Sequence, residues 1–527
     1  MSSTIQVTGT RTGKNVAQTR PLTGLSSLLR LRTLKGQFLL QASLLLLLAA
    51  LLTLAGAISL SRASTDLTTI DSGSIPSVNY AQAITQYIEV IDAQSADFLA
   101  AAGLTTTSPC TVVGTSTTQS LTVHACDERN IDAETVLANQ QLFLAAHNTT
   151  YPGEQTAVER ITIGLESYLG DIHLMRTDFG LAKGKIDPTD PYLQQAYQAY
   201  LSASAILHDQ VSLATLGTGQ IPLTRETSLP ACTLPDQQTL SANQWTQGGL
   251  TDALDCLSDI NYTHLNAAYT DSANFLTGAT VLLAILCVLF CALLLLSILR
   301  MIVTTRRILN PGLVAAILLA LFLSVSLVTL LGNLGAVGST ALQDGVFKQL
   351  VKDDYQSIYD AALLQRYGTD ANADESRWLI AQEFNDQANI AHWQTDWNNN
   401  IQQIAKLIQG AHANQTWQEE IQPLANIDIY WGEYHTIDGQ IRSTAQNQSD
   451  PTRLLDAEAI STGKSNQAFG KFINAVGQLS QANLKHYNQT LQSAQGSLTL
   501  DFLLCLILFP LAGLLSLWGI AVRLKDF

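Results

Sequence analysis

Apolar residues along this chain gather in four long blocks, and the stretches between the blocks are rich in polar residues. The blocks run from about Gln37 to Leu60, Phe275 to Leu299, Pro311 to Leu334 and Leu498 to Val522. A bilayer core about 30 Å thick needs roughly 20 helical residues, and each block reaches that length. The pattern predicts an integral membrane protein with four transmembrane helices, over 37–60, 275–299, 311–334 and 498–522.

Between the blocks, apolar and small residues recur every three or four positions, which is typical of amphipathic helices. The first region shows the pattern over residues 80–99, 133–146, 157–181, 192–213 and 240–273, and the second over 346–367, 376–409, 415–445 and 454–491. Neither region has a sustained alternation with β-branched residues. We therefore predict an all-α fold, with one helical bundle in residues 62–274 and a second in 336–497.

The two regions share three short sequence matches that keep their order, which indicates a diverged tandem repeat. The matches are Tyr87-x4-Asp92-Ala93 with Tyr355-x4-Asp360-Ala361, Tyr168-x-Gly170-Asp171-x-His173 with Tyr430-x-Gly432-Glu433-x-His435, and Leu257-Ser258-x2-Asn261-x2-His264-x-Asn266 with Leu479-Ser480-x2-Asn483-x2-His486-x-Asn488. The predicted unit is a span, an outer helical bundle and a second span, and the chain uses it twice.

The positions of Lys and Arg predict the orientation, because cytoplasmic loops of membrane proteins carry an excess of both residues. The basic pieces are the tail 1–36, the link 300–310 with Arg300, Arg306 and Arg307, and the stub 523–527. We expect all three in the cytoplasm, with both termini, and both bundles outside a plasma membrane. Most of the net charge of −15 then falls outside.

Four cysteines lie in the first outer region, and an even number in an oxidising compartment suggests disulfides. Four cysteines allow three pairings, of which we favour the local ones, Cys110–Cys126 and Cys232–Cys256. A zinc site is the weaker interpretation, since no CxxC pair or neighbouring histidine completes one.

The motifs of catalysis are missing from this sequence. It contains no Gly-rich phosphate loop, nucleophile elbow or HExxH helix, and its basic cytoplasmic pieces are too short for a catalytic domain. We expect no enzyme activity, no catalytic residue, no cofactor, no metal and no nucleic-acid partner. The spans also lack the carboxylates, lysines or histidines that line ion paths inside a membrane. Transport is therefore a less favoured function than the two considered below.

Several outer residues invite a functional interpretation that competes with a structural one. His173, His264, His435 and His486 occupy matched positions in the repeat, and packing roles are favoured over ligand or metal binding. The tryptophans of the second region, among them Trp393, Trp397 and Trp417, favour core packing. If exposed, these three would be the first candidate surface for an extracellular partner.

The layout of two span–bundle–span units resembles the four-helix-bundle sensor modules of bacterial chemoreceptors and histidine kinases without their cytoplasmic output. The link Arg306-Arg307-Ile308-Leu309-Asn310-Pro311-Gly312-Leu313 is similar to the R-R-x-x-N-x-x-L junction of actinobacterial GlnX-type membrane proteins. That resemblance implies a relay of amino-acid sensing from an extracytoplasmic solute-binding lipoprotein to a cytoplasmic protein kinase. It carries no catalytic residues over to this chain.

The leading hypothesis is therefore a transmembrane signal relay, with Arg300, Arg306, Arg307 and Asn310 as its cytoplasmic contact. An extracytoplasmic binding protein, a cytoplasmic kinase and the lipid bilayer are its expected partners, and paired spans make a homodimer plausible. The alternative is a non-catalytic scaffold of the cell envelope, which predicts constitutive partner binding.

Overall fold

The computed structural model describes residues 34–105, 107–113, 118–182, 187–208, 229–305, 310–335 and 345–524. The predictions for most of the basic tail, for Arg306 and Arg307 and for the last three residues therefore lie outside the described residues.

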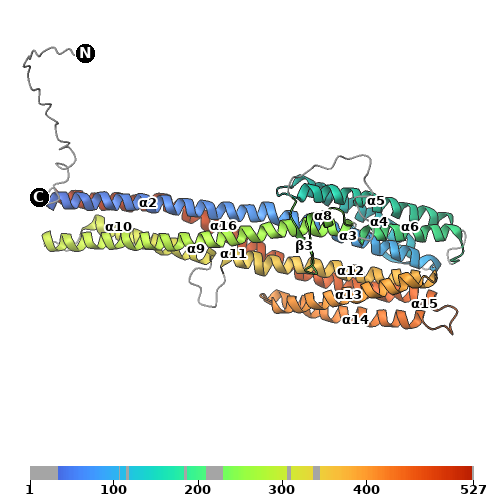
Figure 1. The fold of residues 1–527 in the computed structure, drawn as a ribbon. Helices are drawn as coiled ribbons and strands as arrows, with labels where there is room; N and C mark the ends of the chain where they lie inside the picture. Colours follow the sequence, from blue (N-terminus) through green and yellow to red (C-terminus); the bar gives the residue numbers. More distant parts are fainter. Residues whose placement is uncertain are drawn as a thin grey trace, which may run out of the picture. The chain divides into compact units, whose positions relative to one another are not determined.

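The described chain is almost wholly helical, which confirms the all-α prediction (Figure 1). The long helices are α2 (Leu34–Thr69), α3 (Ile75–Ala100), α4 (Val123–His147), α5 (Glu154–Leu181), α6 (Pro191–Leu207), α9 (Leu250–Thr305), α10 (Pro311–Gly335), α12 (Gln356–Glu383), α13 (Gln387–Ala413), α14 (Ile421–Ala445) and α16 (Asn466–Leu524). Shorter pieces are α8 (Ala242–Trp245), α11 (Val346–Lys348), α15 (Arg453–Ile460), the 3₁₀ turns η2 (Ala101–Gly103) and η4 (Gln418–Glu420), and the π-helical segments η1 (Ile70–Ser74), η3 (Gln349–Tyr355) and η5 (Ser461–Ser465).

Four helical segments of the described chain are long and apolar enough to cross a membrane, and they contain the four predicted blocks. The segments are Lys35–Ala100, Leu250–Thr304, Pro311–Gly335 and Arg453–Val522. Three of them extend far beyond the roughly 20 residues that a bilayer requires. In those three the helix continues without a loop from the apolar block into polar sequence.

The apolar parts of α2, α9, α10 and α16 form one compact unit, which comprises residues 34–58, 281–328 and 502–524 apart from the undescribed 306–309. Small residues bring its helices together, as is common between membrane helices. A Cβ atom on Gly312 of α10 would lie 2.9 Å from the backbone oxygen of Leu515 in α16. Large aliphatic side chains such as Leu47, Leu282 and Leu503 are exposed, which suits contact with lipid.

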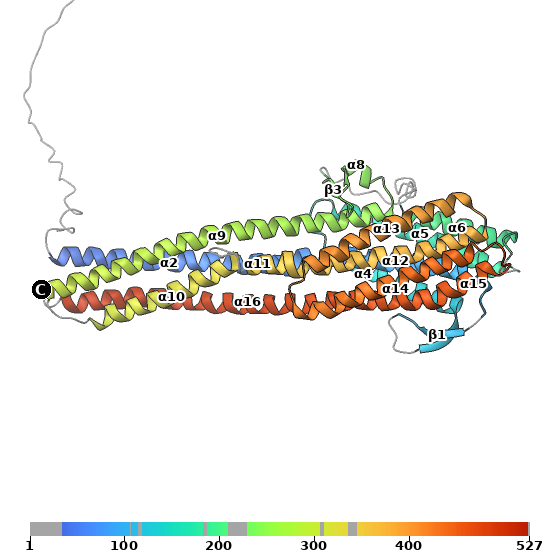
Figure 2. The same ribbon diagram turned by 90° about the horizontal axis from the view of Figure 1, so that it is seen from below.

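The remaining described residues form a second compact unit, between residues 59–280 and 329–501. One apolar core joins α3, α4, α5, α6 and the beginning of α9, and further cores join α12 to α13, α14, α15 and the first turns of α16. Helices α3 and α12 pack along each other. They lie at the centre of this unit, and they connect its first-region helices with its second-region helices (Figures 1 and 2).

The structure corrects two of the predicted helices. The expected helix 376–409 is broken, because α12 ends at Glu383 and α13 begins at Gln387. Asn385 turns the chain there with a φ of 53°, a left-handed conformation that asparagine adopts more readily than most residues. The expected helix 240–273 begins only at Leu250, since residues 239–246 form a short strand and a single helical turn.

Two short hairpins also interrupt the helical pattern, and the sequence pattern did not predict them. Strands β1 (Thr107–Thr111) and β2 (Thr118–Thr122) pair in antiparallel fashion, as do β3 (Cys232–Thr233) and β4 (Thr239–Leu240). They lie at opposite edges of this unit in the view of Figure 2. Their residues are mostly Thr, Ser and Gln, so they lack the apolar alternation that marks a buried strand.

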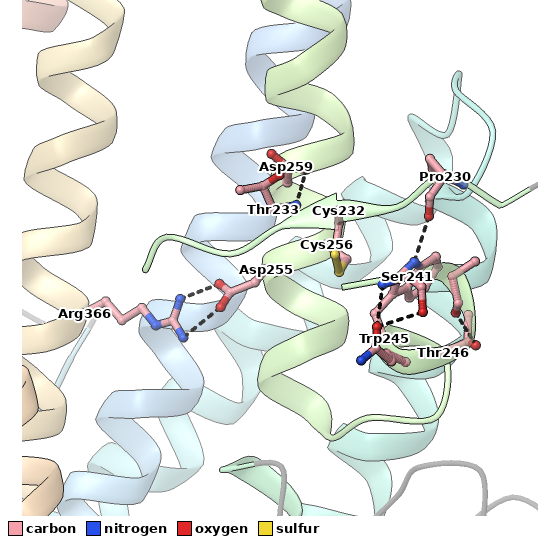
Figure 3. The surroundings of a disulfide bond; sticks show 12 residues. Pro230, Cys232, Thr233, Ser241, Trp245, Thr246, Asp255, Cys256, Asp259 and Arg366 are labelled. Carbon is pink, nitrogen blue, oxygen red and sulfur yellow. Dashed lines mark hydrogen bonds and ion pairs between the residues drawn. A yellow bond between two sulfur atoms is a disulfide. The ribbon is translucent and has the colours of Figure 1, made fainter. Parts of the chain in front are cut away.

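A disulfide ties each hairpin to a helix, and both predicted pairings are confirmed. Cys110 of β1 bonds Cys126 of α4, and Cys232 of β3 bonds Cys256 of α9, with Cα–Cα distances of 5.9 and 5.3 Å. Around the second bond, the backbone N–H of Thr233 donates to Asp259 at 2.7 Å (Figure 3). Covalent attachment thus replaces the apolar face that these short strands lack.

Replacement of Cys256 by Ser should lower the free energy of unfolding by about 3 kcal/mol, because the bond closes a loop of intermediate length in the unfolded chain. Thermal unfolding of the detergent-purified protein measures the loss. Cys291→Ala, which changes a free cysteine in the same helix, is the control. Peptide mapping without reduction should recover Cys110 joined to Cys126; a Cys110–Cys232 peptide would contradict the assignment.

Candidate functional site: a buried charge network between α3 and α12

Helix α12 carries charged residues where a helix is normally apolar. Every position from Ala371 to Ala381 is buried, and this stretch includes Asp374, Glu375 and Arg377. A helix that is buried on all sides is usually hydrophobic throughout, and buried charges persist only when they are paired and hydrogen-bonded. The contacts of these side chains therefore decide what this part of the molecule can do.

Arg377 is fully buried and contacts three carboxylates. Its Nη1 donates to Asp370 at 2.8 Å and to Asp374 at 2.6 Å, and both acceptors lie on α12. Its Nε donates to Asp92 of α3 at 3.1 Å, and Nη2 donates to the same carboxylate. One guanidinium thus joins the central helix of the first region to the central helix of the second.

Other helices complete the hydrogen bonds of these acids. The hydroxyls of Tyr168 and Tyr200 donate to Asp92 at 3.2 and 3.3 Å. The amide of Asn400 donates to Asp370 at 2.9 Å and to Asp374 at 3.0 Å. We call this set the Arg377 network; its members are Asp92, Tyr168, Tyr200, Asp370, Asp374, Arg377 and Asn400.

The pKa values of the carboxyls in and beside the network shift in opposite directions. Burial opposes ionisation of Asp92, but Arg377 and His208 outweigh it, and the pKa of Asp92 lies below its usual value. Burial and the neighbouring Asp370 raise the pKa of Asp374 well above its usual value. Burial, with a contribution from Asp370, likewise raises the pKa of Glu89 to about 7. The pKa of one buried carboxyl is thus lowered, while the pKa values of two others are raised.

Glu89, His208 and Asp370 offer ligand atoms that all lie within 4.8 Å of one another, so their geometry could hold a metal ion. Two arginines already supply positive charge to this group. Nη2 of Arg377 lies 2.9 Å from Nε2 of His208, and Nε of Arg366 lies 3.8 Å from Glu89. A metal ion at this place would compete with both arginines for the ligand atoms. We interpret the group as ion pairing, and the expected absence of a metal stays a prediction.

The contacts between the two regions extend beyond Arg377. Ser376 of α12 and Asn466 of α16 both donate to Asp97 of α3, the latter at 2.8 Å. Arg366 of α12 donates to Asp255 of α9 at 3.3 Å through Nη2, and its Nη1 makes a second bond to the same carboxylate (Figure 3). Polar contacts therefore connect the first-region helices α3 and α9 to α12 and α16.

A second feature is a set of hydrogen bonds next to the π-helical segment η1. The side chain of Asn148 donates to the backbone oxygen of Gly73 at 3.2 Å and to Ser77 at 2.6 Å. Glu154 accepts from the backbone N–H groups of Thr150 and Tyr151. The ring of Tyr151 stacks on His264 of α9, with ring centroids 3.9 Å apart.

The same set recurs next to the π-helical segment η3. Asn414 donates to the backbone oxygen of Asp353 at 3.3 Å and to Ser357 at 2.9 Å. Glu420 accepts from the backbone N–H groups of Thr416 and Trp417, both at 2.7 Å. The ring of Trp417 stacks on His486 of α16, with ring centroids 4.1 Å apart. His264 and His486 thus have the same contact, and both are packing residues.

These shared contacts shift the register of two sequence matches. Ser77 corresponds to Ser357, which pairs Tyr87 with Tyr367 and not with Tyr355. Glu154 corresponds to Glu420, which pairs the fully buried Tyr168 with the fully buried Tyr434. In the alignment that these contacts define, Tyr430 lies one helical turn before the residue that matches Tyr168.

The other members of that match are on the surface. Gly170, His173, Gly432 and His435 are exposed, and Tyr430 is half-buried against the core of the second region. The ring of His435 lies 5.4 Å from that of Trp397. Of the residues in this sequence match, Tyr168 alone belongs to the Arg377 network. The described contacts bring none of the others into it.

Two of the tryptophans considered as a partner surface are core residues. Trp393 and Trp397 are 2% and 7% exposed, and Trp417 is half-buried with its indole N–H donated to Asp354 at 3.0 Å. Trp393 faces the guanidinium of Arg377 at 5.0 Å, and Trp397 faces that of Arg442 at 4.7 Å. The structure thus favours the packing alternative, because these rings cover buried cations by cation–π contact.

The residues of the basic link that the structure describes contact helix ends within the apolar unit. Arg300 donates to Gln37 of α2. Asn310 donates to the backbone oxygen of Gly519 in α16 at 2.7 Å and accepts from the backbone N–H of Gly312 at 3.2 Å. Asn310 therefore fixes the first turn of α10 to the end of α16.

The Arg377 network was not found from the sequence. Its members come from five helices, and no local spacing links Asp92 to an arginine almost three hundred residues later. A usable signal was present in α12, where Asp370, Asp374 and Arg377 fall at helical spacing on one face. These charged residues alternate with small and apolar residues such as Ala371, Ala373 and Trp378.

Comparison of the chain with protein-family models, curated proteins and solved structures finds no match. Its function is therefore inferred from the contacts described above and from the sequence pattern.

Replacement of Arg377 by Met should lower the free energy of unfolding by about 3–5 kcal/mol, because it leaves buried carboxylates without their cation. Arg176→Met is the control, since Arg176 pairs with the exposed Glu128 and Asp132 and should lose less than about 1 kcal/mol. Adding Asp92→Asn to Arg377→Met should restore part of the loss. Equal, small losses for both single variants in thermal unfolding would contradict a stabilising network.

Stability should fall as the pH rises from about 5 to about 8. Burial raises the pKa of Glu89, Glu134 and Glu383 to about 7 and that of Glu375 to about 8, from 4.5 in the unfolded chain. Between those values the folded protein binds more protons than the unfolded chain, so a rise in pH favours unfolding. The melting temperature measures this fall, which Glu375→Gln should reduce. A melting temperature that rises over this range would contradict it.

Proposed function

We propose that this protein is a transmembrane signal relay of the plasma membrane. The four apolar helices span the bilayer, both termini are cytoplasmic, and the two polar regions are helical bundles outside the cell. Occupation of the outer part, by a solute-binding protein or a ligand, alters contacts at the cytoplasmic ends. A separate cytoplasmic partner, such as a protein kinase, reads that change, because the chain has no catalytic domain of its own.

The observation that carries the proposal is the continuity of three helical segments, Lys35–Ala100, Leu250–Thr304 and Arg453–Val522. Each runs without a loop from an apolar block into the helices that form the polar bundles. A rigid helix transmits an axial shift of about 1–2 Å along its whole length, which is the kind of movement that helical switches use. A loop at the same place would absorb it.

The Arg377 network supplies a reason for such a shift to have two discrete positions. Its ion pairs join α3 to α12. A buried charge that has lost its partner is strongly destabilising unless it is solvated. Positions in which the ions are separated but still buried are therefore unfavourable. Moving a two-state element from mostly one state to mostly the other needs about 5.5 kcal/mol of differential binding. A docked protein has enough interface to supply that amount.

The contacts shared by Asn148 and Asn414 support a duplication of the span–bundle–span unit. In both regions the loop between two bundle helices binds the π-helical segment of the first helix and stacks on a histidine of the last helix. π-helical turns often occur at functional sites. In this proposal they are the points where a change in the bundle enters the long helices.

The resemblance of the basic link to the GlnX-type junction supports the choice of partners. It suggests a solute-binding lipoprotein outside the cell and a protein kinase inside. The link and the N-terminal tail are then the surface that the cytoplasmic partner contacts.

Asn310→Ala should abolish the response to the outer signal while the protein stays in the membrane at its normal level. The substitution removes the hydrogen bond that fixes α10 to α16 at Gly519. The readout is phosphorylation of cytoplasmic kinase substrates after amino acids are added to cells that carry the variant in place of the wild-type gene. Asn399→Ala, on an exposed face of α13, is the control and should respond normally.

Two outcomes would contradict this proposal. One is a response that persists unchanged after deletion of the gene. The other is partner binding that is constitutive and indifferent to Asn310→Ala, which is the behaviour expected of an envelope scaffold.

A further inference from the structure

A cavity of about 260 Å³ lies between α3, α4, α12 and α16. Its polar lining comes from Gln94 and Asp97 of α3, Asp127 and Asn130 of α4, Thr369 and Asn372 of α12, and Asn466 of α16. The first two helices belong to the first region of the chain and the last two to the second. A molecule held there would contact both.

Three oxygen atoms around this cavity are buried and find no hydrogen-bond partner among the described residues. They are Oδ2 of Asp127, Oδ1 of Asn372 and Oε1 of Gln94. Asp127 is 7% and Asn372 5% exposed, so bulk water does not solvate them. Buried polar atoms are normally paired, and three unpaired ones beside one cavity need an explanation. All three are acceptors.

Two side-chain amides of the cavity wall are already engaged with the protein. The amide of Asn466 donates to Asp97 at 2.8 Å, and the amide of Asn130 donates to the sulfur of Cys126 at 3.6 Å. Both oxygens of Asp97 are satisfied, one by Asn466 and the other by Ser376. The ionisable side chains among the described lining residues are those of Asp97 and Asp127, so the charge that this wall can offer to a ligand is negative.

We propose that this cavity binds a small organic ammonium ion, whose N–H groups donate to Asp127, Asn372 and Gln94. The proposal names the ligand of the relay and to that extent rests on the proposed function, but the binding itself does not depend on any partner. Burial, followed by repulsion from Asp97, raises the pKa of Asp127 well above its usual value. A bound cation relieves that repulsion and allows the carboxylate to ionise.

The rest of the wall narrows the class of ligand further. Val90, Ala93 and Phe469 give it an apolar side that suits the carbon skeleton of an amine. No lysine, arginine or histidine is among the described residues that line the cavity, so the carboxylate of a free amino acid would have no cationic partner. The site therefore fits an amine without a carboxyl group. A calcium ion is a poorer fit, because it needs six to eight oxygen ligands and one of the two carboxylates is already saturated.

Ligand occupancy would act directly on the contacts between the two regions. Asp97 lines the cavity and also binds Ser376, the residue before Arg377. The ligand thus stabilises the arrangement in which α3 and α12 are joined, because it supplies hydrogen bonds that both helices lack without it.

The test is equilibrium dialysis of the full-length protein in detergent with radiolabelled butane-1,4-diamine, with thermal unfolding in butylammonium as a second readout. The wild type should bind the diamine, and butylammonium should raise its melting temperature. Asp127→Asn should weaken binding at least about tenfold, the loss of one charge-assisted hydrogen bond. Asp132→Asn, an exposed acid on the same helix, is the matched control and should change binding less than about twofold.

Asn372→Leu is a second variant, which removes an unpaired oxygen and fills part of the cavity, and it too should abolish binding. Three results would overturn the proposal: binding that both variants leave intact, glutamine binding as tightly as the amines, or calcium binding through Asp127 while no amine binds. The amine-binding experiment uses purified protein, so it is independent of the cellular test of Asn310→Ala. If no amine binds but Asn310→Ala abolishes the cellular response, the ligand class is wrong and the relay stands. If the amine binds but Asn310→Ala leaves the response unchanged, the relay is wrong and the binding site stands.

Discussion

The second unit of this molecule depends on one constraint, namely that the charges buried between α3 and α12 must neutralise one another. Arg377 meets Asp92 across that contact and two further acids on its own helix. Without these ion pairs the two central helices would bury several carboxylates at high cost. The network does not make the unit more stable than an apolar contact would. We infer that it specifies the register in which the two regions meet, because a change of register would separate Arg377 from Asp92.

This constraint explains several features that otherwise look unrelated. The tryptophans of the second region cover the arginines, since an aromatic face is one of the few apolar surfaces that a desolvated guanidinium accepts. Tyr168 and Tyr200 bring hydroxyls to Asp92 from α5 and α6, so three helices of the first region meet at this acid. The cavity beside Asp97 leaves acceptors unpaired at the same contact, which makes that contact sensitive to what occupies it.

Much of the fold follows from local pattern, whereas the site does not. Four apolar blocks and helical periodicity predict the long helices, and neighbouring cysteines predict both disulfides, because these depend on short spacing. The hairpins are held by disulfides and not by an apolar face, so periodicity misses them. The Arg377 network needs the packing of five helices. Likewise, Tyr168 and Tyr430 share a local motif, but only the contacts of Glu154 and Glu420 reveal that Tyr168 and Tyr434 follow matching glutamates at the same distance.

The measurement that tests the relay most directly is a crosslinking pull-down of the tagged protein from its native membrane, followed by mass spectrometry. A relay predicts recovery of an extracytoplasmic solute-binding protein together with a cytoplasmic protein kinase. Recovery of envelope or cell-division proteins alone, in the same amounts with and without the outer ligand, would contradict it and favour a scaffold.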